Sequence, residues 1–299
     1  MSEPERPQFD VRAARHPRTG TYLARRRIRW PYALTSPFRL DTAPADMLTL
    51  IVQSASGALV AGDSVRQRIE VGPGAALHVT TQAATAVHGM PDGARAEETV
   101  EMTVGAGGFV EHVPEPRVLF PSADLVQRVR VDIDPSATTI LSDGFVTHHP
   151  APAPDGRRPL QPVPGLAPAS GATMFRRLAS ETIVRTGSAV RVVDRIDIPG
   201  AALAGSPWCA HGWLVILCAW ERIDTATAVA ELAAAVAPID SLYAGASALP
   251  LDSGIGLRLA ARDGEALRRG LEVAWATARR LLTGWPPRSR RKGGRSEER

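Results

Sequence analysis

Apolar and polar residues alternate with a period near two across residues 21–145, and glycine, proline and aspartate interrupt the alternation at short intervals. The alternation is cleanest over residues 65–71 and 125–133. Successive side chains of a strand point to opposite faces, so this pattern predicts strands with one buried face. Further strands are expected over residues 175–198, with a turn at 186–188.

Three segments, 71–77, 104–110 and 133–139, share a weak repeat. Each starts at an apolar strand end, passes through a short run of small residues and enters a new strand, with spacings of 33 and 29 residues. Recurrence at such a period is typical of stacked β units in which each layer covers the next. The fold class expected is therefore mainly β, with a stacked or coiled, β-helix-like architecture. Because the three copies are imperfect, the pattern is also compatible with ordinary hairpins in a β-sandwich.

Two α-helices are expected in the C-terminal half. The first covers residues 225–236, with Asp224 as its N-cap, and ends before Pro238. The second covers residues 264–283, where apolar side chains at steps of three or four form one stripe, and Gly284 ends it.

The run from 213 to 220 is apolar without alternation, which predicts a strand buried on both faces. Residues 148–170 hold seven prolines in 23 positions and are expected to form an insertion loop. We expect one β-rich domain over 21–287, a flexible N-terminus at 1–20 and a disordered basic tail at 288–299.

Composition limits the compartment. The longest strongly apolar run has eight residues, whereas a membrane helix needs roughly 20, so no membrane span is expected. The first ten residues are polar and do not resemble a secretory signal. Two cysteines, Cys209 and Cys218, are too few for a disulfide scaffold. A cytoplasmic location is expected.

The net charge of +4 and the pI near 9.6 raise the possibility of a nucleic-acid-associated β protein. Six of the basic residues lie in the last twelve positions, so the rest of the chain is near neutral. Aromatic residues make up only 5%, and they rarely interleave with basic ones. Nucleic acid is therefore kept only as the alternative reading.

The motifs of common catalytic sites are absent from the sequence: it has no phosphate-binding P-loop, no G-x-S-x-G, no H-E-x-x-H and no C-x-x-C. Cys209, His211 and Cys218 could together hold a borderline metal ion. Two small buried hydrophobes beside a core strand are the more ordinary reading of the cysteines. The adjacent His148 and His149 point to opposite sides of an extended chain and do not converge on a metal.

Two polar clusters interrupt the strand pattern. The first consists of Thr80, Thr81, Gln82 and Thr85, and fits either a polar strand face or the lining of a wet passage. The second combines the carboxylates of Glu111 and Glu115 with the imidazole of His112. These groups suit a divalent ion in transit or an acid/base pair, so a carboxylate-dependent hydrolase is a further alternative. An exposed, charged strand end is the simplest reading.

At these clusters the sequence resembles the UreD (UreH) family of urease accessory proteins. Four stretches carry the resemblance: 57–63, which ends in Gly62 and Asp63; 80–85 (TTQAAT); 111–116 (EHVPEP); and the C-terminal helix with Trp275 and Arg279. The sequence departs from the family at 53–57, where the family usually has His-Pro-Pro-Gly-Gly. The family's Gly-Arg-x-x-x-Gly-Glu-x-Phe segment is replaced by the proline-rich insertion, so this chain is a divergent member.

The resemblance implies a scaffold rather than an enzyme. Such a protein binds apo-urease together with UreF and the GTPase UreG, and helps deliver nickel, with an internal passage as the proposed route. It implies no tightly bound cofactor, only nickel in transit, and neither nucleic acid nor membrane as a partner. The expected passage lining comprises Thr80, Thr81, Gln82, Thr85, Gly62 and Asp63. Glu111, His112 and Glu115 are the expected transient nickel contacts, and Trp275 and Arg279 the expected partner contacts.

Overall fold

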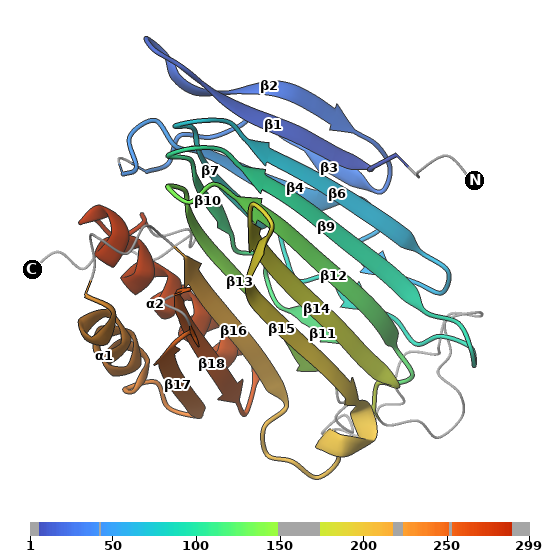
Figure 1. Cartoon of the computed structure of the whole chain (residues 1–299). Helices are drawn as coiled ribbons and strands as arrows, with labels where there is room; N and C mark the ends of the chain where they lie inside the picture. The colour runs from blue at the N-terminus through green and yellow to red at the C-terminus, as the bar shows by residue number, and fades with distance from the viewer. Residues whose placement is uncertain (1–5, 42, 149–173, 218–223, 251–252, 289–299) are drawn as a thin grey trace, which may run out of the picture.

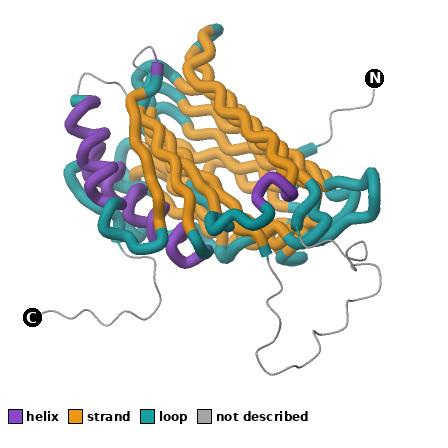
Figure 2. The backbone as a smooth tube through the Cα atoms, turned by 90° about the horizontal axis from the view of Figure 1, so that it is seen from below, coloured by secondary structure: helices purple, strands orange, loops and turns teal. Residues whose placement is uncertain are grey.

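The computed structural model describes residues 6–41, 43–148, 174–217, 224–250 and 253–288. Two β-sheets stack face to face, and two helices cover the outer face of one of them (Figures 1 and 2). Within the described residues, the first sheet has seven strands in the order β15-β14-β12-β9-β6-β1-β2. The second sheet has eleven, with the main order β17-β18-β16-β13-β10-β7-β4-β3 and the short β5, β8 and β11 beside it.

The strands of the first sheet are β1 (Phe9–His16), β2 (Gly20–Ile28), β6 (Ser64–Val71), β9 (Ala96–Val104), β12 (Asp124–Ile133), β14 (Arg177–Thr186) and β15 (Ala189–Pro199). Those of the second are β3 (Tyr32–Leu34), β4 (Leu48–Ser54), β5 (Ala58–Leu59), β7 (Ala76–Thr81), β8 (Ala86–Val87), β10 (Phe109–His112), β11 (Arg117–Leu119), β13 (Thr138–Thr147), β16 (Ala210–Leu217), β17 (Leu242–Ala248) and β18 (Ile255–Ala261). A short 3-10 helix, η1 (Gly200–Leu203), follows β15.

From β4 to β14 the chain winds between the two sheets as a coil. It visits β4, β7, β10 and β13 in one sheet and β6, β9, β12 and β14 in the other, and neighbouring strands of each set are parallel. Each passage therefore stacks on the one before it. This mainly β architecture confirms the expected fold class and is compatible with the β-helix-like prediction.

The sequence repeat coincides with the stacking. Val71 pairs with Val104, and Val104 pairs with Ile133, at the ends of β6, β9 and β12. The turns that follow are also hydrogen-bonded to one another, as where the Gly74 N–H donates to the Ala106 carbonyl at 2.9 Å. The small residues of the repeat are thus the tight turns of three successive layers.

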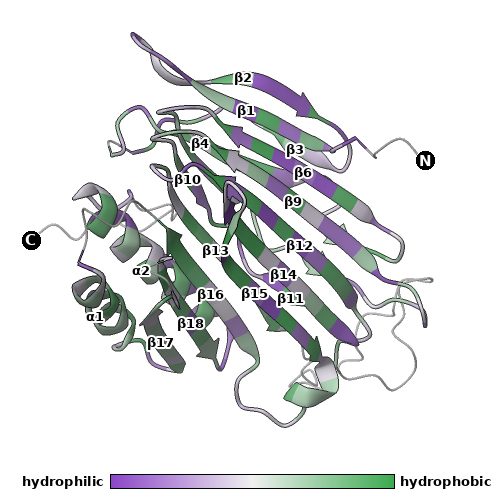
Figure 3. Ribbon diagram, in the orientation of Figure 1, coloured by the Kyte–Doolittle hydropathy of each residue, from purple (hydrophilic) through white to green (hydrophobic). Residues whose placement is uncertain are grey.

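Alternation along the strands builds the core. The inner faces of the two sheets carry apolar side chains, which appear as green bands along the strands in Figure 3. A second apolar cluster lies between the other face of the eleven-stranded sheet and the helices. β16 contributes to both clusters, because Trp213 and Val215 face the first sheet while Leu214 and Ile216 face the helices. This strand is buried on both faces over its described length, as its unbroken apolar sequence predicts.

The helices are α1 (Thr225–Val236) and α2 (Gly264–Thr283), with the boundaries expected from the sequence. The Asp224 carboxylate accepts a hydrogen bond from the Thr227 N–H at 2.9 Å. Asp263 caps α2 in the same way, accepting from the Ala266 N–H at 2.8 Å. Gly284 ends α2 with a φ of +80°, a left-handed conformation that glycine adopts without strain.

The expected flexible N-terminus at 1–20 is wrong for its described part. Phe9–His16 forms β1, which lies parallel to β6 and antiparallel to β2. Phe9 and Val11 are fully buried between the sheets, so the strand is tied down by packing as well as by hydrogen bonds. Most of the predicted insertion loop (148–170), most of the basic tail (288–299) and the last residues of the 213–220 run lie outside the described residues.

Candidate functional site

Charged side chains are buried between the two sheets. Glu98, Gln127 and Ser180 are cross-strand neighbours in one inward-facing row of β9, β12 and β14. Arg117 of β11 and Asp143 of β13 face them from the other sheet, and these five side chains form the inter-sheet cluster. The contacts of this cluster join residues 16 to 53 positions apart in the chain.

Hydrogen bonds connect the whole inter-sheet cluster. The Arg117 guanidinium donates from Nε to Glu98 Oε2 at 3.1 Å and also pairs with Asp143. The Gln127 amide donates to Asp143 Oδ2 at 2.6 Å, and its carbonyl accepts from Ser180 at 3.3 Å. Burial alone would lower the pKa of Arg117, but the Asp143 and Glu98 carboxylates outweigh burial and raise it. The guanidinium therefore stays charged in the interior.

A second buried network, the helix cluster, joins α2 to the eleven-stranded sheet. Arg279 donates from Nε to Glu111 Oε1 at 2.6 Å, and Trp275 donates from Nε1 to Glu111 Oε2 at 2.9 Å. His78 Nδ1 lies 2.7 Å from the same carboxylate, and its ring stacks on Trp275 with centroids 5.0 Å apart. Asp41 Oδ2 completes the cluster, 3.0 Å from Arg279 Nη1.

Three predicted site residues, Glu111, Trp275 and Arg279, belong to the helix cluster and are buried there. Burial alone would raise the pKa of Glu111, but contact with His78 and Arg279 lowers it, so its carboxylate is ionised and fully engaged. Trp275 and Arg279 were expected to contact a partner, yet both side chains are buried and point to Glu111. Their place is in the core, because the apolar stripe of α2 faces the sheet.

The threonine-rich segment lies where β7 ends. Thr80, Thr81 and Thr85 are half-buried, and Gln82 is exposed. The Thr81 hydroxyl accepts from the Glu115 N–H at 2.9 Å, so this segment and the Glu111–Pro116 stretch are neighbours. Burial raises the pKa of the Glu115 carboxyl; Arg268 opposes this and Glu272 and Glu265 add to it.

Two pockets meet at this point. A pocket of about 930 Å³ opens beside α2, and a cavity of about 90 Å³ lies between the sheets. Both are lined by Thr80, Thr81, Gln82, Pro114 and Glu115. The small cavity also touches Arg117, which in turn lines a pocket of about 550 Å³ between β14–β15 and β16–β18. Polar groups thus mark a series of adjoining spaces that crosses the interior.

The remaining predicted residues have distinct places. His112 is buried and lines the small cavity, and burial lowers its pKa to about 4, so its imidazole is neutral near pH 7. Gly62 has a φ of +84° in the turn before β6, and the Asp63 carboxylate accepts from the Val60 N–H at 2.8 Å. Cys209 and His211 lie apart: the thiol donates to the Arg262 carbonyl and the imidazole contacts the Trp208 carbonyl. Cys218 lies outside the described residues.

Sequence reasoning missed the inter-sheet cluster. Gln127 occupies an inward position of a strand whose other inward residues are apolar, as does Glu98 on β9. A polar residue in an apolar column was therefore the available signal. Arg117 and Asp143 gave no such signal, because β11 is too short to show alternation and β13 is buried on both faces.

Within the described ranges, no group of three or more His, Cys, Asp or Glu side chains is placed to hold a metal ion. No helix in the same ranges is long and apolar enough to cross a membrane. The class defined by this fold and site is a coiled β protein that buries two charged networks, one between its sheets and one beneath its C-terminal helix.

Comparison with known proteins specifies the class. The family model described as UreD urease accessory protein matches residues 5–155 and 163–293. "Urease accessory protein UreD 2" of Bradyrhizobium sp. (strain BTAi1 / ATCC BAA-1182) is 38% identical over 95% of this chain and 93% of the relative. UreD 1 of Methylorubrum populi is 34% identical over 91% of this chain and 87% of the relative. UreD 1 of Pseudomonas syringae pv. tomato is 32% identical over 91% of this chain and 90% of the relative.

The chain belongs to the UreD family of urease accessory proteins. Its role is in urease maturation, as an assembly factor rather than an enzyme. Family membership also implies interaction with urease and with other accessory proteins. The hydrolase alternative finds no support in the geometry, because the Glu111 carboxylate is committed to Arg279 and His78.

Proposed function

We propose that this chain carries nickel to apo-urease through its interior, in a complex with UreF and the GTPase UreG. The observation that supports this is the series of adjoining spaces, which begins beside α2, passes Glu115 and reaches Arg117 between the sheets. A path for an ion in transit needs weak oxygen ligands, because a closed high-affinity site would trap the ion. Threonine hydroxyls and one half-buried carboxylate meet this need.

In this proposal Glu115 and His112 make the transient nickel contacts. Glu115 lines both the outer pocket and the inner cavity, so an ion moving between them passes its carboxylate. His112 is neutral near pH 7 and offers a nitrogen lone pair, a ligand that suits nickel. Glu111 has a different role, since its oxygens hold α2 in place through Arg279.

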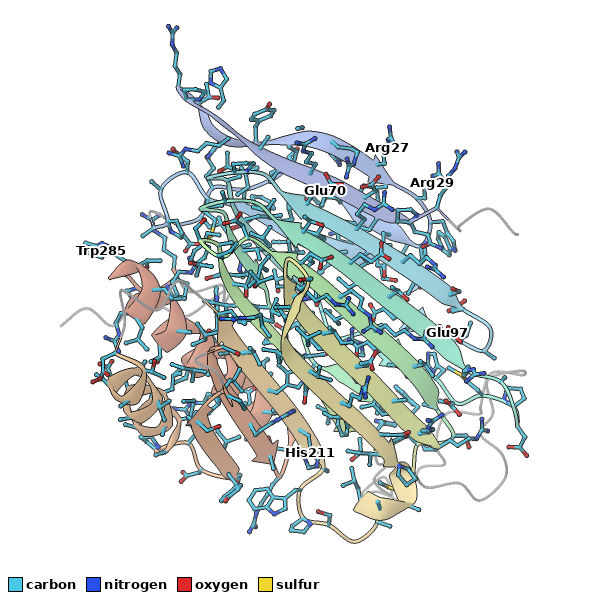
Figure 4. The ribbon with its side chains drawn as sticks, viewed as in Figure 1. Arg27, Arg29, Glu70, Glu97, His211 and Trp285 are labelled. Atoms are coloured by element: carbon cyan, nitrogen blue, oxygen red, sulfur yellow. The ribbon has the colours of Figure 1, made fainter. Side chains whose placement is uncertain are left out.

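The helper proteins are proposed to bind at the exposed side of α2 and beyond its end. Trp285, just past the helix, is 65% exposed and projects at the edge of the molecule (Figure 4), and Arg288, three positions further on, lines the outer pocket. A helper seated there would deliver nickel directly to the pocket that α2 lines.

The test is reconstituted activation of apo-urease with nickel and the helper proteins. Glu115→Gln should slow nickel-dependent activation several-fold at unchanged protein stability, and Glu115→Asp should recover part of the rate. Glu101→Gln is the matched control, because Glu101 is an exposed carboxylate on the outer face of the seven-stranded sheet. Activation by Glu115→Gln at the wild-type rate would show that nickel does not pass this carboxylate.

A further inference from the structure

An exposed tryptophan lies next to two exposed arginines at one end of the seven-stranded sheet. Trp30 is 72% exposed and directly follows Arg29, while Arg27 lies two positions earlier, near the end of β2. Figure 4 shows the side chains of Arg27 and Arg29 projecting away from the sheet. β2 is the edge strand of this sheet and pairs only with β1 among the described strands. These residues are therefore open to another molecule.

The two arginines differ in their surroundings from Arg25. Arg25, on the same strand, pairs with Asp10 at 2.8 Å and with Glu70 at 2.7 Å. Within the part of the chain that the structure describes, Arg27 and Arg29 make no such pair. Two unneutralised cations beside a large exposed aromatic ring form a surface complementary to carboxylates.

A groove of about 490 Å³ adjoins this tryptophan. Its lining is mixed: Trp30, Pro31, Ala58, Val60 and Val65 are apolar, and Gln8, Ser56, Asp63, Ser64 and His88 are polar. Val60 is itself 36% exposed, which extends the apolar surface beyond the ring. Exposed aromatic and apolar groups clustered at a groove are typical of protein-binding sites. The groove, Arg27, Arg29 and Trp30 are called the Trp30 surface below.

The groove also adjoins a cavity of the interior. It shares Pro31 and Val65 with the cavity of about 90 Å³ that reaches Glu115 and Arg117. The Trp30 surface and Trp285 lie on opposite sides of the molecule in Figure 4, where Arg29 and Trp285 mark the two ends. The helper proteins are proposed to bind on the α2 side, so the groove is the opening left for apo-urease, which receives the nickel.

We propose that the Trp30 surface docks apo-urease through an acidic, extended segment of that protein, an inference that rests on the proposed delivery of nickel. Arg27 and Arg29 bind carboxylates of the segment, and an apolar side chain beside them enters the groove against Trp30. Binding energy at such surfaces concentrates on tryptophan and arginine. Docking here places apo-urease at the groove that adjoins the small cavity between the sheets.

A protein segment fits this surface better than a nucleic acid does. The groove places the aliphatic side chains of Val60 and Val65 beside Trp30, which suits an apolar side chain of a protein segment. The lining holds two aromatic rings, Trp30 and His88, and the His88 ring packs against Phe120, whereas single-stranded nucleic acids bind on successive stacked rings.

Binding of the full-length chain to nickel-free urease, alone and with the helper proteins, tests the proposal. Trp30→Ala and the double variant Arg27→Glu/Arg29→Glu should each weaken binding roughly tenfold or more. The loss caused by the double variant should shrink as salt is raised, because salt screens exposed charges. Arg191→Glu is the matched control: Arg191 is an exposed arginine on β15, at the far edge of the same sheet. Its affinity should equal that of the wild type.

Three results would overturn the docking site. The first is wild-type affinity for urease in both variants, even if they aggregate, since the arginines would then only protect an edge strand. The second is binding of a single-stranded RNA that the same variants abolish while urease binding persists. The third is no binding of urease by the wild-type chain under any of these conditions. Glu115→Gln should bind urease normally, so failed nickel delivery and failed docking are distinguishable.

Discussion

Arg279 of α2 and Glu111 of β10 form a fully buried ion pair between residues 168 positions apart in the chain. The pair fastens the C-terminal helix to the centre of the eleven-stranded sheet. Trp275 and His78 add hydrogen bonds to the same carboxylate, so no oxygen of Glu111 is free to take an ion without breaking a bond. The carboxylate therefore acts on fold stability.

Glu111→Ala should destabilise the fold by about 3–5 kcal/mol, because the buried Arg279 guanidinium keeps only Asp41 as a counter-charge and Trp275 loses its hydrogen-bond acceptor. The sequence analysis expected a transient nickel contact at Glu111, whereas its carboxylate is committed to this buried cluster. Urea-induced unfolding followed by tryptophan fluorescence measures the change. Glu115→Ala, four residues away and half-buried, is the control and should cost much less. Equal unfolding midpoints for the two variants would contradict the structural role of Glu111.

His112 should make stability depend on pH. Its pKa is about 4 in the folded chain and near 6.5 when unfolded, so between these values the unfolded state binds more protons. Stability is then complete above about pH 6.5 and falls as the pH drops toward 4, by at most about 3 kcal/mol. His112→Asn and His112→Gln both lack the titrating ring and should flatten this slope. A slope that persists in both variants would assign it to other groups.

Arg117→Ala should cost about 3–5 kcal/mol, because the buried carboxylates of Glu98 and Asp143 lose their shared cation. Arg117→Lys keeps the charge but not the forked donor geometry, and its loss should be smaller. Thermal unfolding at neutral pH measures both. Arg128→Ala is the control, since Arg128 pairs with Glu97 on the solvent-facing side of the same sheet and should contribute at most about 1 kcal/mol. An Arg117→Ala variant as stable as this control would contradict the assignment.

Asp263→Ala should destabilise the chain by about 1 kcal/mol through loss of the α2 N-cap. Asp263→Ser should retain most of the stability, because a serine hydroxyl can accept the same hydrogen bond. Chemical unfolding separates the two variants. Equal losses for alanine and serine would show that the carboxylate acts through something other than capping.

Helix boundaries and turns of this fold could be predicted wherever a few consecutive residues determine them. Asp224 and Gly284 mark helix boundaries through capping and a left-handed turn, both properties of a few consecutive residues. The repeat at 71–77 also predicted stacking, because small residues recur where layers turn tightly. N-terminal residues were misjudged, since the burial of Phe9 depends on β6, more than fifty residues away.

The buried polar clusters were harder to predict, because contacts with residues distant in the sequence determine which polar side chains are buried. Nothing near Arg279 in the sequence indicates that it lies beneath the helix rather than on its surface, and its distant partners Glu111 and Asp41 explain its burial. Thr80–Thr85 and Glu115 were recognised as polar clusters from composition, and they do line a common space. Their role in nickel transfer stays a prediction until activation is measured.

The unequal spacing of the repeats indicates where insertions and deletions can occur in this fold. The layers are 33 and 29 residues apart, yet strand pairing keeps its register in both sheets, and the four-residue difference falls between β7 and β9. The rim that carries the glycine turns is held by hydrogen bonds from layer to layer, as at Gly105 N to the Val71 carbonyl (2.8 Å). Because the four extra residues lie between β7 and β9, insertions and deletions should accumulate on the opposite rim, around the short pairs that β8 makes with β5 and β11. That rim also carries the Trp30 groove, so specificity for a partner can diverge there without disturbing the coil.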